Sequence, residues 1–510
     1  DGQQLTGSPV LTIFFEGVQY EIALVTTVGA PGADGTTLTF DIAQSLANTS
    51  AIFGGALIGD IAFDGTLEGP TRALITYRST VDQAYTTVYR QSDINEGDSI
   101  GNNATVSGTL LANNISLTGE TEADTSLASL TVPTHTVATS IVSVNGSAAS
   151  ANVELKPGDI VTFKLAYDLE TGDYEQFKLS AFMPLPLFDL TGITWTQGTN
   201  PGQWTYGSGD TNADDVNSVT VGTGNSLVFD FGDYATSNLV GQRIEVLFTL
   251  MVGNQPFADQ RPLSVLGQSN QLTTANQSQL ISSGVVTIAS VAEPVLTIKH
   301  GVVAVAAGTG GIVSGTTGTW AAAGTAGKPF TGSVTDLAAV DGNVSNIDGG
   351  DLVRLATAIE NTGGLGAFDV ATTVTLPPGF AFSGLGLASA NLTIYRGDGT
   401  ELTSGTDYSV AGNVITFLDH NGQPSLLPGR AGTAADTSGA NVIIITYDVI
   451  ASISIAASSN LQTSAVLNKF SSTDNGPDFT GGDDPQDTAE QIVAAPVITQ
   501  VFANGTLSND

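Results

Sequence analysis

NIDGGDLVRLATAIENTGGLGAFDVATTVTLPPGF, residues 346–380, contains two segments in which apolar and polar residues alternate. A Gly-Asp turn precedes the first segment, an Asn-Thr-Gly turn separates it from the second, and Leu-Pro follows the second. Alternation with a period of two is the pattern of a β-strand with one buried and one exposed face. The stretch therefore predicts two strands joined by a polar turn.

The same order of features recurs in residues 154–187, ELKPGDIVTFKLAYDLETGDYEQFKLSAFMPLPL. Two other kinds of segment also recur. Strands with an aromatic residue and a nearby Asp begin near Thr36, Asn225 and Asn413, and β-branched strands occupy residues 72–81, 242–252 and 441–450. Segments that repeat in a fixed order indicate tandem units that share one fold.

This organisation predicts an all-β chain of tandem antiparallel immunoglobulin-like (Ig-like) β-sandwich domains arranged end to end. We expect residues 1–130 to form a partial or divergent unit, residues 131–292 a full unit, and residues 293–491 a unit with a long insertion. Residues 492–510 repeat the small residues, Pro and apolar strand of residues 290–301. They are expected to be the first strand of a further unit, or a strand donated to a neighbour.

Composition limits the function classes. The chain has 510 residues, of which 41% are hydrophobic and 12% charged, and its formal net charge is −35. So strong an acidic excess argues against binding to nucleic acid and to anionic membrane surfaces. It contains no Cys, which favours a bacterial product over a disulfide-rich eukaryotic one. No apolar run is long enough to predict membrane insertion.

One part of the sequence resembles a known family. Gly-Asp, a strand, Asn-Thr-Gly, a second strand and Leu-Pro-x-Gly are found here as Gly350, Asp351, Asn361, Thr362, Gly363, Leu376, Pro377 and Gly379. This pattern resembles the bacterial conserved-repeat domain known as domain of unknown function eleven, which occurs in tandem in very large surface proteins. The resemblance implies a secreted bacterial cell-surface protein that serves as a stalk, an adhesin or a coat component.

Catalytic residues are not indicated by any motif. The sequence has no Gly-x-Ser-x-Gly elbow, no His-Glu-x-x-His and no phosphate-binding loop, and its three His residues are far apart. We therefore expect the protein not to be an enzyme.

Calcium is the cofactor that the sequence suggests, because Ca²⁺ prefers six to eight oxygen ligands. The densest group of oxygen-bearing side chains is Asp474, Asn475, Asp478, Asp483, Asp484 and Asp487, in a loop that also contains glycines. A second group is Asp210, Asn212, Asp214 and Asp215, and a third is Glu120, Glu122 and Asp124. The alternative for each group is a solvated acidic surface.

Three aromatic residues, Trp195, Trp204 and Tyr206, lie close together in the sequence. Aromatic faces can stack on sugar rings, so these residues are candidates for glycan contact. Packing of at least one of the Trp rings in a sandwich core is the alternative.

Three functions remain open. The first is a rod-like structural or adhesive stalk on the cell surface, whose partners are surface components. The second is a head-to-tail filament or surface-layer subunit, in which residues 492–510 add a strand to a neighbouring copy. The third is a carbohydrate-binding module.

Overall fold

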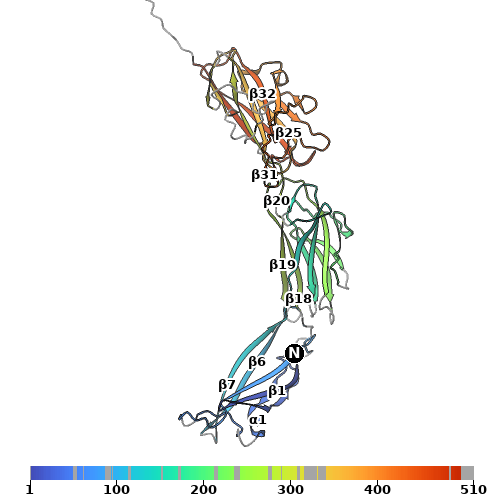
Figure 1. Ribbon diagram of the computed structural model, residues 1–510, viewed down its shortest axis with the longest axis vertical. Helices are drawn as coiled ribbons and strands as arrows, with labels where there is room; N and C mark the ends of the chain where they lie inside the picture. The colour runs from blue at the N-terminus through green and yellow to red at the C-terminus, as the bar shows by residue number, and fades with distance from the viewer. Residues whose placement is uncertain are drawn as a thin grey trace, which may run out of the picture.

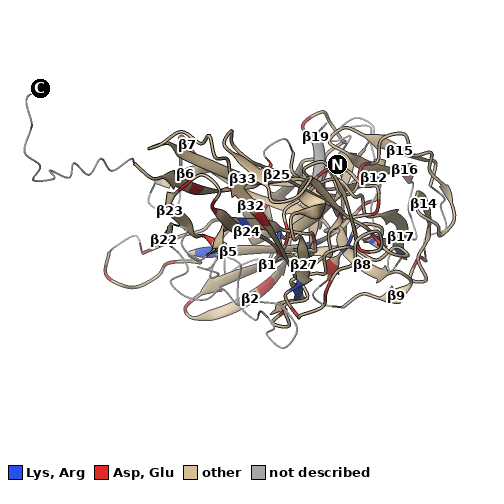
Figure 2. Cartoon of the chain, turned by 90° about the horizontal axis from the view of Figure 1, so that it is seen from above, with Lys and Arg blue, Asp and Glu red and all other residues tan. Residues whose placement is uncertain are grey.

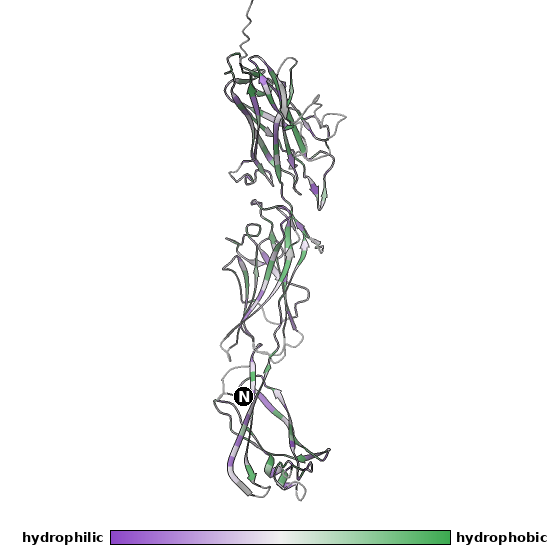
Figure 3. Cartoon of the chain, turned by 90° about the vertical axis from the view of Figure 1, so that its left-hand side faces the viewer, coloured by the Kyte–Doolittle hydropathy of each residue, from purple (hydrophilic) through white to green (hydrophobic). Residues whose placement is uncertain are grey.

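The computed structural model of the chain is nearly all β-strand, and α1 (Ile42–Asn48) is the single α-helix of its described residues. Three modules follow one another along the long axis (Figure 1), and the same series is seen from the side in Figure 3. We call them the N-terminal module (β1 to β7), the middle module (β8 to β20) and the C-terminal module (β21 to β34). The described residues are 2–49, 54–60, 63–86, 94, 96–112, 116–150, 153–169, 174–211, 216–234, 242–273, 278–288, 290–306, 310–314, 330, 340–481 and 484–495.

The middle module is a sandwich of two sheets with strand orders β13-β14-β17-β11-β8-β9 and β15-β16-β12-β18-β19. In β11, Val161, Phe163 and Leu165 are fully buried, so alternate side chains face the opposite sheet as predicted. The strands are β8 (Ala138–Val144), β9 (Ser147–Ala148), β10 (Glu154–Leu155), β11 (Ile160–Leu169), β12 (Tyr174–Phe182), β13 (Thr196–Gln197), β14 (Gln203–Tyr206), β15 (Ser218–Gly222), β16 (Ser226–Tyr234), β17 (Gln242–Met251), β18 (Leu263–Thr273), β19 (Ser278–Ile288) and β20 (Ser290–Val291).

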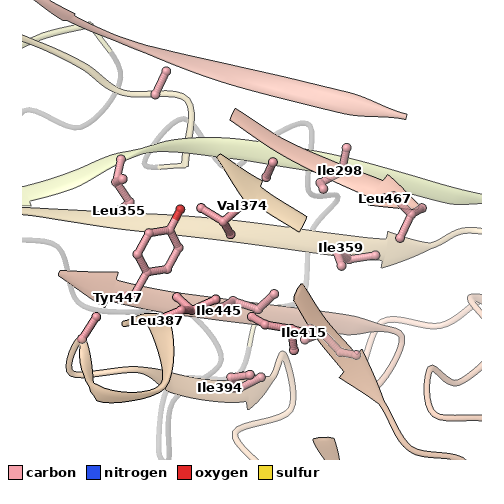
Figure 4. Close-up of a cluster of buried hydrophobic side chains, with 14 of the residues drawn as sticks. Ile298, Leu355, Ile359, Val374, Leu387, Ile394, Ile415, Ile445, Tyr447 and Leu467 are labelled. Carbon is pink, nitrogen blue, oxygen red and sulfur yellow. The ribbon is translucent and has the colours of Figure 1, made fainter. Parts of the chain in front are cut away.

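The C-terminal module pairs a sheet of order β21-β24-β32-β26 with one of order β22-β23-β34-β33-β25-β29-β28. Figure 4 shows the core between them, where Leu355 and Ile359 of one sheet approach Val374 and Leu467 of the other. The strands are β21 (Leu296–Val305), β22 (Gly311–Ser314), β23 (Asn343–Ile347), β24 (Leu352–Asn361), β25 (Phe368–Thr375), β26 (Phe380–Phe382), β27 (Thr393–Arg396), β28 (Tyr408–Ala411), β29 (Val414–Phe417), β30 (Arg430–Ala431), β31 (Ala434–Ala435), β32 (Val442–Ala451), β33 (Asn460–Ser471) and β34 (Gln486–Val493).

The two sandwiches show the fold class that the sequence predicts. β11 and β12 lie within residues 154–187, and β24 and β25 lie within residues 346–380, so the repeated strand–turn–strand passes from one sheet to the other in both modules. Part of the long insertion belongs to the packed interior, because Val340 is fully buried and packs with Phe330 on the outer face of β24 and β32. Most of the insertion lies outside the described residues.

The N-terminal module is smaller. It has a sheet of order β2-β1-β5, the hairpins β3-β4 and β6-β7, and α1. Its buried core consists of Leu11, Ile13 and Ile22 from the sheet and Leu46 from α1. The strands are β1 (Gln3–Phe15), β2 (Val18–Ala23), β3 (Val25–Val28), β4 (Leu38–Asp41), β5 (Arg72–Val81), β6 (Ser99–Ala112) and β7 (Ser116–Thr131).

The strand predicted in residues 492–510 is only partly described. Ile492 and Val493 complete β34 inside the C-terminal module, where Val493 is in register with Ile347 of β23. Residues 496–510 lie outside the described residues. Donation of this segment to a neighbour stays a prediction.

A polar group lies inside the C-terminal core. His300 is fully buried on β21, with Nδ1 3.0 Å from Thr357 Oγ1 and Nε2 3.0 Å from Thr463 Oγ1. Thr357 lies on β24 and Thr463 on the facing sheet, so the imidazole links the two layers. Burial lowers the pKa of His300 to about 4, because the charged imidazolium would be desolvated there.

We expect His300 to destabilise the C-terminal module as pH falls. The unfolded residue takes up its proton near pH 6.5 and the folded residue near 4, so the unfolded state is favoured increasingly across that window. The loss is about 3 kcal/mol. Urea unfolding at pH 7, 5 and 4 should show that the free energy of unfolding falls less toward low pH for His300→Gln than for the wild type. An equal loss of stability toward low pH in both proteins would contradict this account of His300.

Candidate functional site: the inter-module joints and a carboxylate cluster

A buried arginine joins the middle and C-terminal modules. Arg430 donates from Nε to Asp259 Oδ2 over 3.1 Å and from Nη2 to Asp259 Oδ1 over 2.5 Å. Its Nη1 also donates to Glu154 Oε1 over 2.8 Å. Arg430 is 6% exposed, and the side chain of Asp259 is 8% exposed. The planar guanidinium therefore fixes two carboxylates of the middle module in one orientation.

Asp259 also bonds to the backbone on both sides of this joint. Its Oδ1 accepts from Glu293 N over 2.9 Å and from Gly364 N over 3.3 Å. Nearby, Asn254 Nδ2 of the middle module donates to Thr473 Oγ1 of the C-terminal module over 3.1 Å. Contacts from several separate segments leave the two sandwiches little freedom to change their angle.

The joint between the N-terminal and middle modules also depends on a buried carboxylate. Glu96 is 1% exposed, and its Oε2 accepts from Tyr167 Oη over 2.6 Å and from Gln271 Nε2 over 2.7 Å. Its Oε1 accepts from His135 N over 3.1 Å. Burial and the Glu96 charge raise the pKa of Tyr167, which keeps its hydroxyl as a donor. Both joints thus use a carboxylate of one module as the acceptor for donors of the next.

Glu293, in the connection to the C-terminal module, has no such partner. It is fully buried, and neither carboxylate oxygen makes a hydrogen bond of good geometry within the described part of the chain, although the Ser472 hydroxyl lies near enough to favour the charged form slightly. Burial, together with the negative charge of Asp259, raises the pKa of Glu293 to about 8. A protonated Glu293 therefore belongs to the stable form of this joint at neutral pH.

Three carboxylates come together at the end of the C-terminal module that faces the middle module. One oxygen of each of Asp369, Asp419 and Asp474 lies within 4.8 Å of the others. Asp369 is on β25, Asp419 follows β29 and Asp474 follows β33, which are neighbouring strands of one sheet. Pairing of these strands, and not proximity in the sequence, brings the carboxylates together.

Hydrogen bonds hold two members of this cluster in place. Asp419 accepts from Asp369 N and Ser425 N, both over 2.9 Å, and Asp369 accepts from Ser471 Oγ over 2.9 Å. Burial raises the pKa of Asp419, which indicates that its negative charge lacks full compensation. The ammonium of Lys469 lies 3.4 Å from Asp369 Oδ2. Carboxylate oxygens are the ligands that Ca²⁺ prefers.

Apart from Asn475, which stays beside Asp474, the other described members of the predicted 474–487 group do not join this cluster. Asp478 accepts from Thr480 N and Oγ1 within its own turn, and Asp487 accepts from His300 N over 2.8 Å. Asn475 Nδ2 donates to Asp474 Oδ1 over 2.8 Å. Asp484 is half-buried before β34, and Asp483 lies outside the described residues.

The second predicted group is described at one position. Asp210 Oδ2 accepts from Glu245 N over 2.7 Å, which attaches the loop to β17. Asn212, Asp214 and Asp215 lie outside the described residues, so a metal site there stays a prediction. Acidic residues occur in all three modules (Figure 2).

The aromatic group predicted for glycan contact is mostly packed inward. Trp204 is 9% exposed, and its ring centroid lies 5.4 Å from that of Tyr206 and 5.7 Å from that of Phe229. Tyr206 Oη accepts from Val216 N over 2.8 Å, and Trp195 packs edge-on against Phe248. Trp204 lies in the middle-module core because β14 directs it toward the opposite sheet, and the half-buried Trp195 and Tyr206 pack against that core.

A further carboxylate group was not predicted from the sequence. Asp60, Asp64 and Glu68 lie in the loop before β5 with their oxygens within 4.8 Å of one another. Asp60 accepts from Asp64 N over 3.1 Å and from Gly65 N over 2.6 Å. The sequence signal for this group is the regular spacing of the three acids around an Asp-Gly turn.

Fold and joints together define the class: an all-β protein of tandem Ig-like sandwiches in series. No protein-family model matches the sequence, and no curated protein is similar to it in sequence. The resemblance to the conserved-repeat family stays a prediction. Among the described residues, no helix has the length and apolar character needed to cross a bilayer.

Solved structures to which the chain is weakly similar include the C-terminal domains of two streptococcal antigen I/II proteins and a pilin subunit. The C-terminal domain of the antigen I/II-family protein AspA of Streptococcus pyogenes has a TM-score of 0.31 and 10% identity, covering 70% of this chain and 99% of that chain. The C-terminal domain of the AgI/II polypeptide BspA of Streptococcus agalactiae has a TM-score of 0.29 and 10% identity, covering 70% and 100%. BcpA, the major pilin subunit of Bacillus cereus, has a TM-score of 0.24 and 11% identity, covering 82% and 92%. Similarities of this size carry no argument about function.

Proposed function

We propose that this chain is part of a rod-like stalk on a bacterial cell surface, with a structural or adhesive role and no enzymatic one. One observation carries the proposal: each joint is closed by a buried carboxylate of one module that accepts hydrogen bonds from the next. At the first joint this is Glu96, and at the second it is Asp259 with Arg430. Such joints make a chain of sandwiches stiff.

The acidic composition supports an extended protein that is surrounded by water. A formal net charge of −35 keeps an extended surface soluble and discourages collapse of one module onto another. The filament and carbohydrate-binding alternatives gain no comparable support from the described contacts.

Electron microscopy of the purified chain, with small-angle scattering, tests the stalk. We expect three bodies in a row with a narrow distribution of angles, and a length on the order of 100 Å or more at roughly 40 Å per module. Glu96→Ala should broaden the angle at the first joint. A compact particle, or a broad distribution of angles in the wild type, would contradict the proposal.

We further propose that Asp369, Asp419 and Asp474 bind Ca²⁺ at the end of the sheet that faces the second joint. The support is the convergence of three carboxylates and the burial of Asp419. An ion there would neutralise like charges beside Thr473, which contacts the middle module. When no ion is bound, the ammonium of Lys469 partly neutralises the cluster through Asp369.

Calcium should therefore raise the thermal midpoint of the C-terminal module, and EDTA should reverse the effect. A ligand present at 100 times its dissociation constant stabilises the folded state by about 2.7 kcal/mol. Asp419→Asn should abolish the shift, whereas Asp398→Asn, at an exposed turn carboxylate, should retain it. Coincident melting curves with Ca²⁺ and with EDTA would remove the metal site and leave the stalk proposal intact.

A further inference from the structure

Each module carries a long hairpin after its β-branched strand. The hairpins are β6-β7 in the N-terminal module, β18-β19 in the middle module and β33-β34 in the C-terminal module. In the middle module, the first hairpin strand pairs on its other side with β12. In the C-terminal module, the first hairpin strand pairs in the same way with β25. Both of these neighbours are antiparallel to the hairpin strand.

The N-terminal hairpin lacks this neighbour. Among the described residues, β6 pairs with β7 and with no other strand. Residues 101–110 of β6 are exposed at every position, whereas Val265 of β18 and Leu467 of β33 are fully buried. Asn102 Nδ2 donates to Tyr77 Oη over 2.5 Å, which ties the hairpin to β5. The backbone on the free side of β6 can therefore accept an added strand.

The sequence of β6 offers no obstacle to pairing with an added strand. SIGNNATVSGTLLA contains no charged residue and no Pro, which are the usual protections of an exposed edge. The acids of this hairpin, Glu120, Glu122 and Asp124, are on β7, the other edge strand, where charge is a usual protection against pairing. In a chain of net charge −35, a neutral 14-residue edge is a place where a second copy can approach without direct repulsion. Val106, 58% exposed, adds apolar surface there.

We propose that two copies of this chain associate through β6. The two β6 strands pair antiparallel about a twofold axis, which joins the hairpins into a four-stranded sheet of order β7-β6-β6-β7 with one β6 from each copy. A twofold arrangement uses the same edge on both copies and closes without further growth. The pairing gives each β6 the antiparallel neighbour that β18 and β33 have within their own modules. The inference adds self-association to the proposed stalk but does not depend on it.

Because the chain has no Cys, single cysteines are specific probes of this pairing. The experiment places one cysteine at a time at residues 102 to 109 of the full chain and measures disulfide-linked dimer under mild oxidation. Around a twofold axis, the distance between a residue and its own copy grows by about 6.6 Å per position, and disulfides need Cα atoms closer than about 7 Å. We expect linkage to peak at one or two adjacent positions and to fall on both sides.

Thr125→Cys is the matched control, since Thr125 lies opposite Thr105 in the hairpin and is equally exposed. It should link at least tenfold less than the best β6 position. Sedimentation should show a wild-type dimer that Thr105→Lys converts to monomer and Thr125→Lys does not. A monomeric wild type, equal linkage along β6, or equal linkage at Thr125 would overturn the inference. If the Thr105→Lys monomer is a single rod of three modules, the stalk proposal stands whether or not the wild type forms a dimer.

Discussion

Glu293→Gln is expected to stabilise the second joint, and most strongly above pH 8. Folded Glu293 releases its proton near pH 8 and the unfolded residue near 4.5. Between these values the native state binds more protons than the unfolded state, so the free energy of unfolding falls as pH rises. The loss reaches about 5 kcal/mol above pH 8. Glutamine has the shape of the protonated acid and does not titrate, so the variant should avoid the loss.

Denaturant unfolding at pH 5, 7 and 9 measures this effect. The variant and the wild type should be close in stability at pH 5 and should separate progressively at pH 7 and 9. Glu96→Gln is the control with the opposite sign, because Glu96 accepts hydrogen bonds from Tyr167 and Gln271 and an amide NH₂ cannot replace a carboxylate oxygen there. A Glu293→Gln protein less stable than the wild type at pH 9 would contradict our account of this residue.

Arg430→Ala should release the middle module from the C-terminal module. The substitution leaves Asp259 buried with its charge uncompensated, and removal of one partner of a buried ion pair costs about 3–5 kcal/mol. Scattering should show a wider range of inter-module angles, and protease should cut near Pro294 more readily. Arg430→Lys should recover part of the loss, since an ammonium keeps the charge but not the two parallel hydrogen bonds.

Arg354 provides a matched control for this prediction. Its guanidinium binds Asp448 through Nε over 2.7 Å and Nη2 over 3.0 Å, in the same two-bond geometry but inside one module. Arg354→Ala should therefore lower the stability of the C-terminal module and leave the inter-module angle unchanged. If Arg354→Ala and Arg430→Ala broaden the angles equally, the joint does not depend on Arg430.

The architecture was largely predictable from the sequence because strand alternation is a local property. Val161, Phe163 and Leu165 in β11 have a period of two that needs no knowledge of the partner sheet. Burial of Val340 was not predictable. Only the assembled sheet shows that β32 has apolar residues on its outer face, against which the insertion packs.

The candidate site was predictable only in part. Asp474 was found because acids are dense around it, but Asp369 and Asp419 reach it through the pairing of β33, β25 and β29. The joint residues Asp259 and Arg430 come from separate modules and carry no local pattern. Trp204 was a candidate either for glycan contact or for core packing, and the sandwich places its ring in the core.

The direction of the strands in the C-terminal module has a mechanical consequence. β21 starts at the joint, and β34 runs antiparallel to β33, which ends beside the joint at Thr473. A pulling force that enters through β21 and leaves through β34 acts lengthwise on both strands. Their ladders to β24 and β33 are then loaded in shear, so many backbone hydrogen bonds must rupture together instead of one after another.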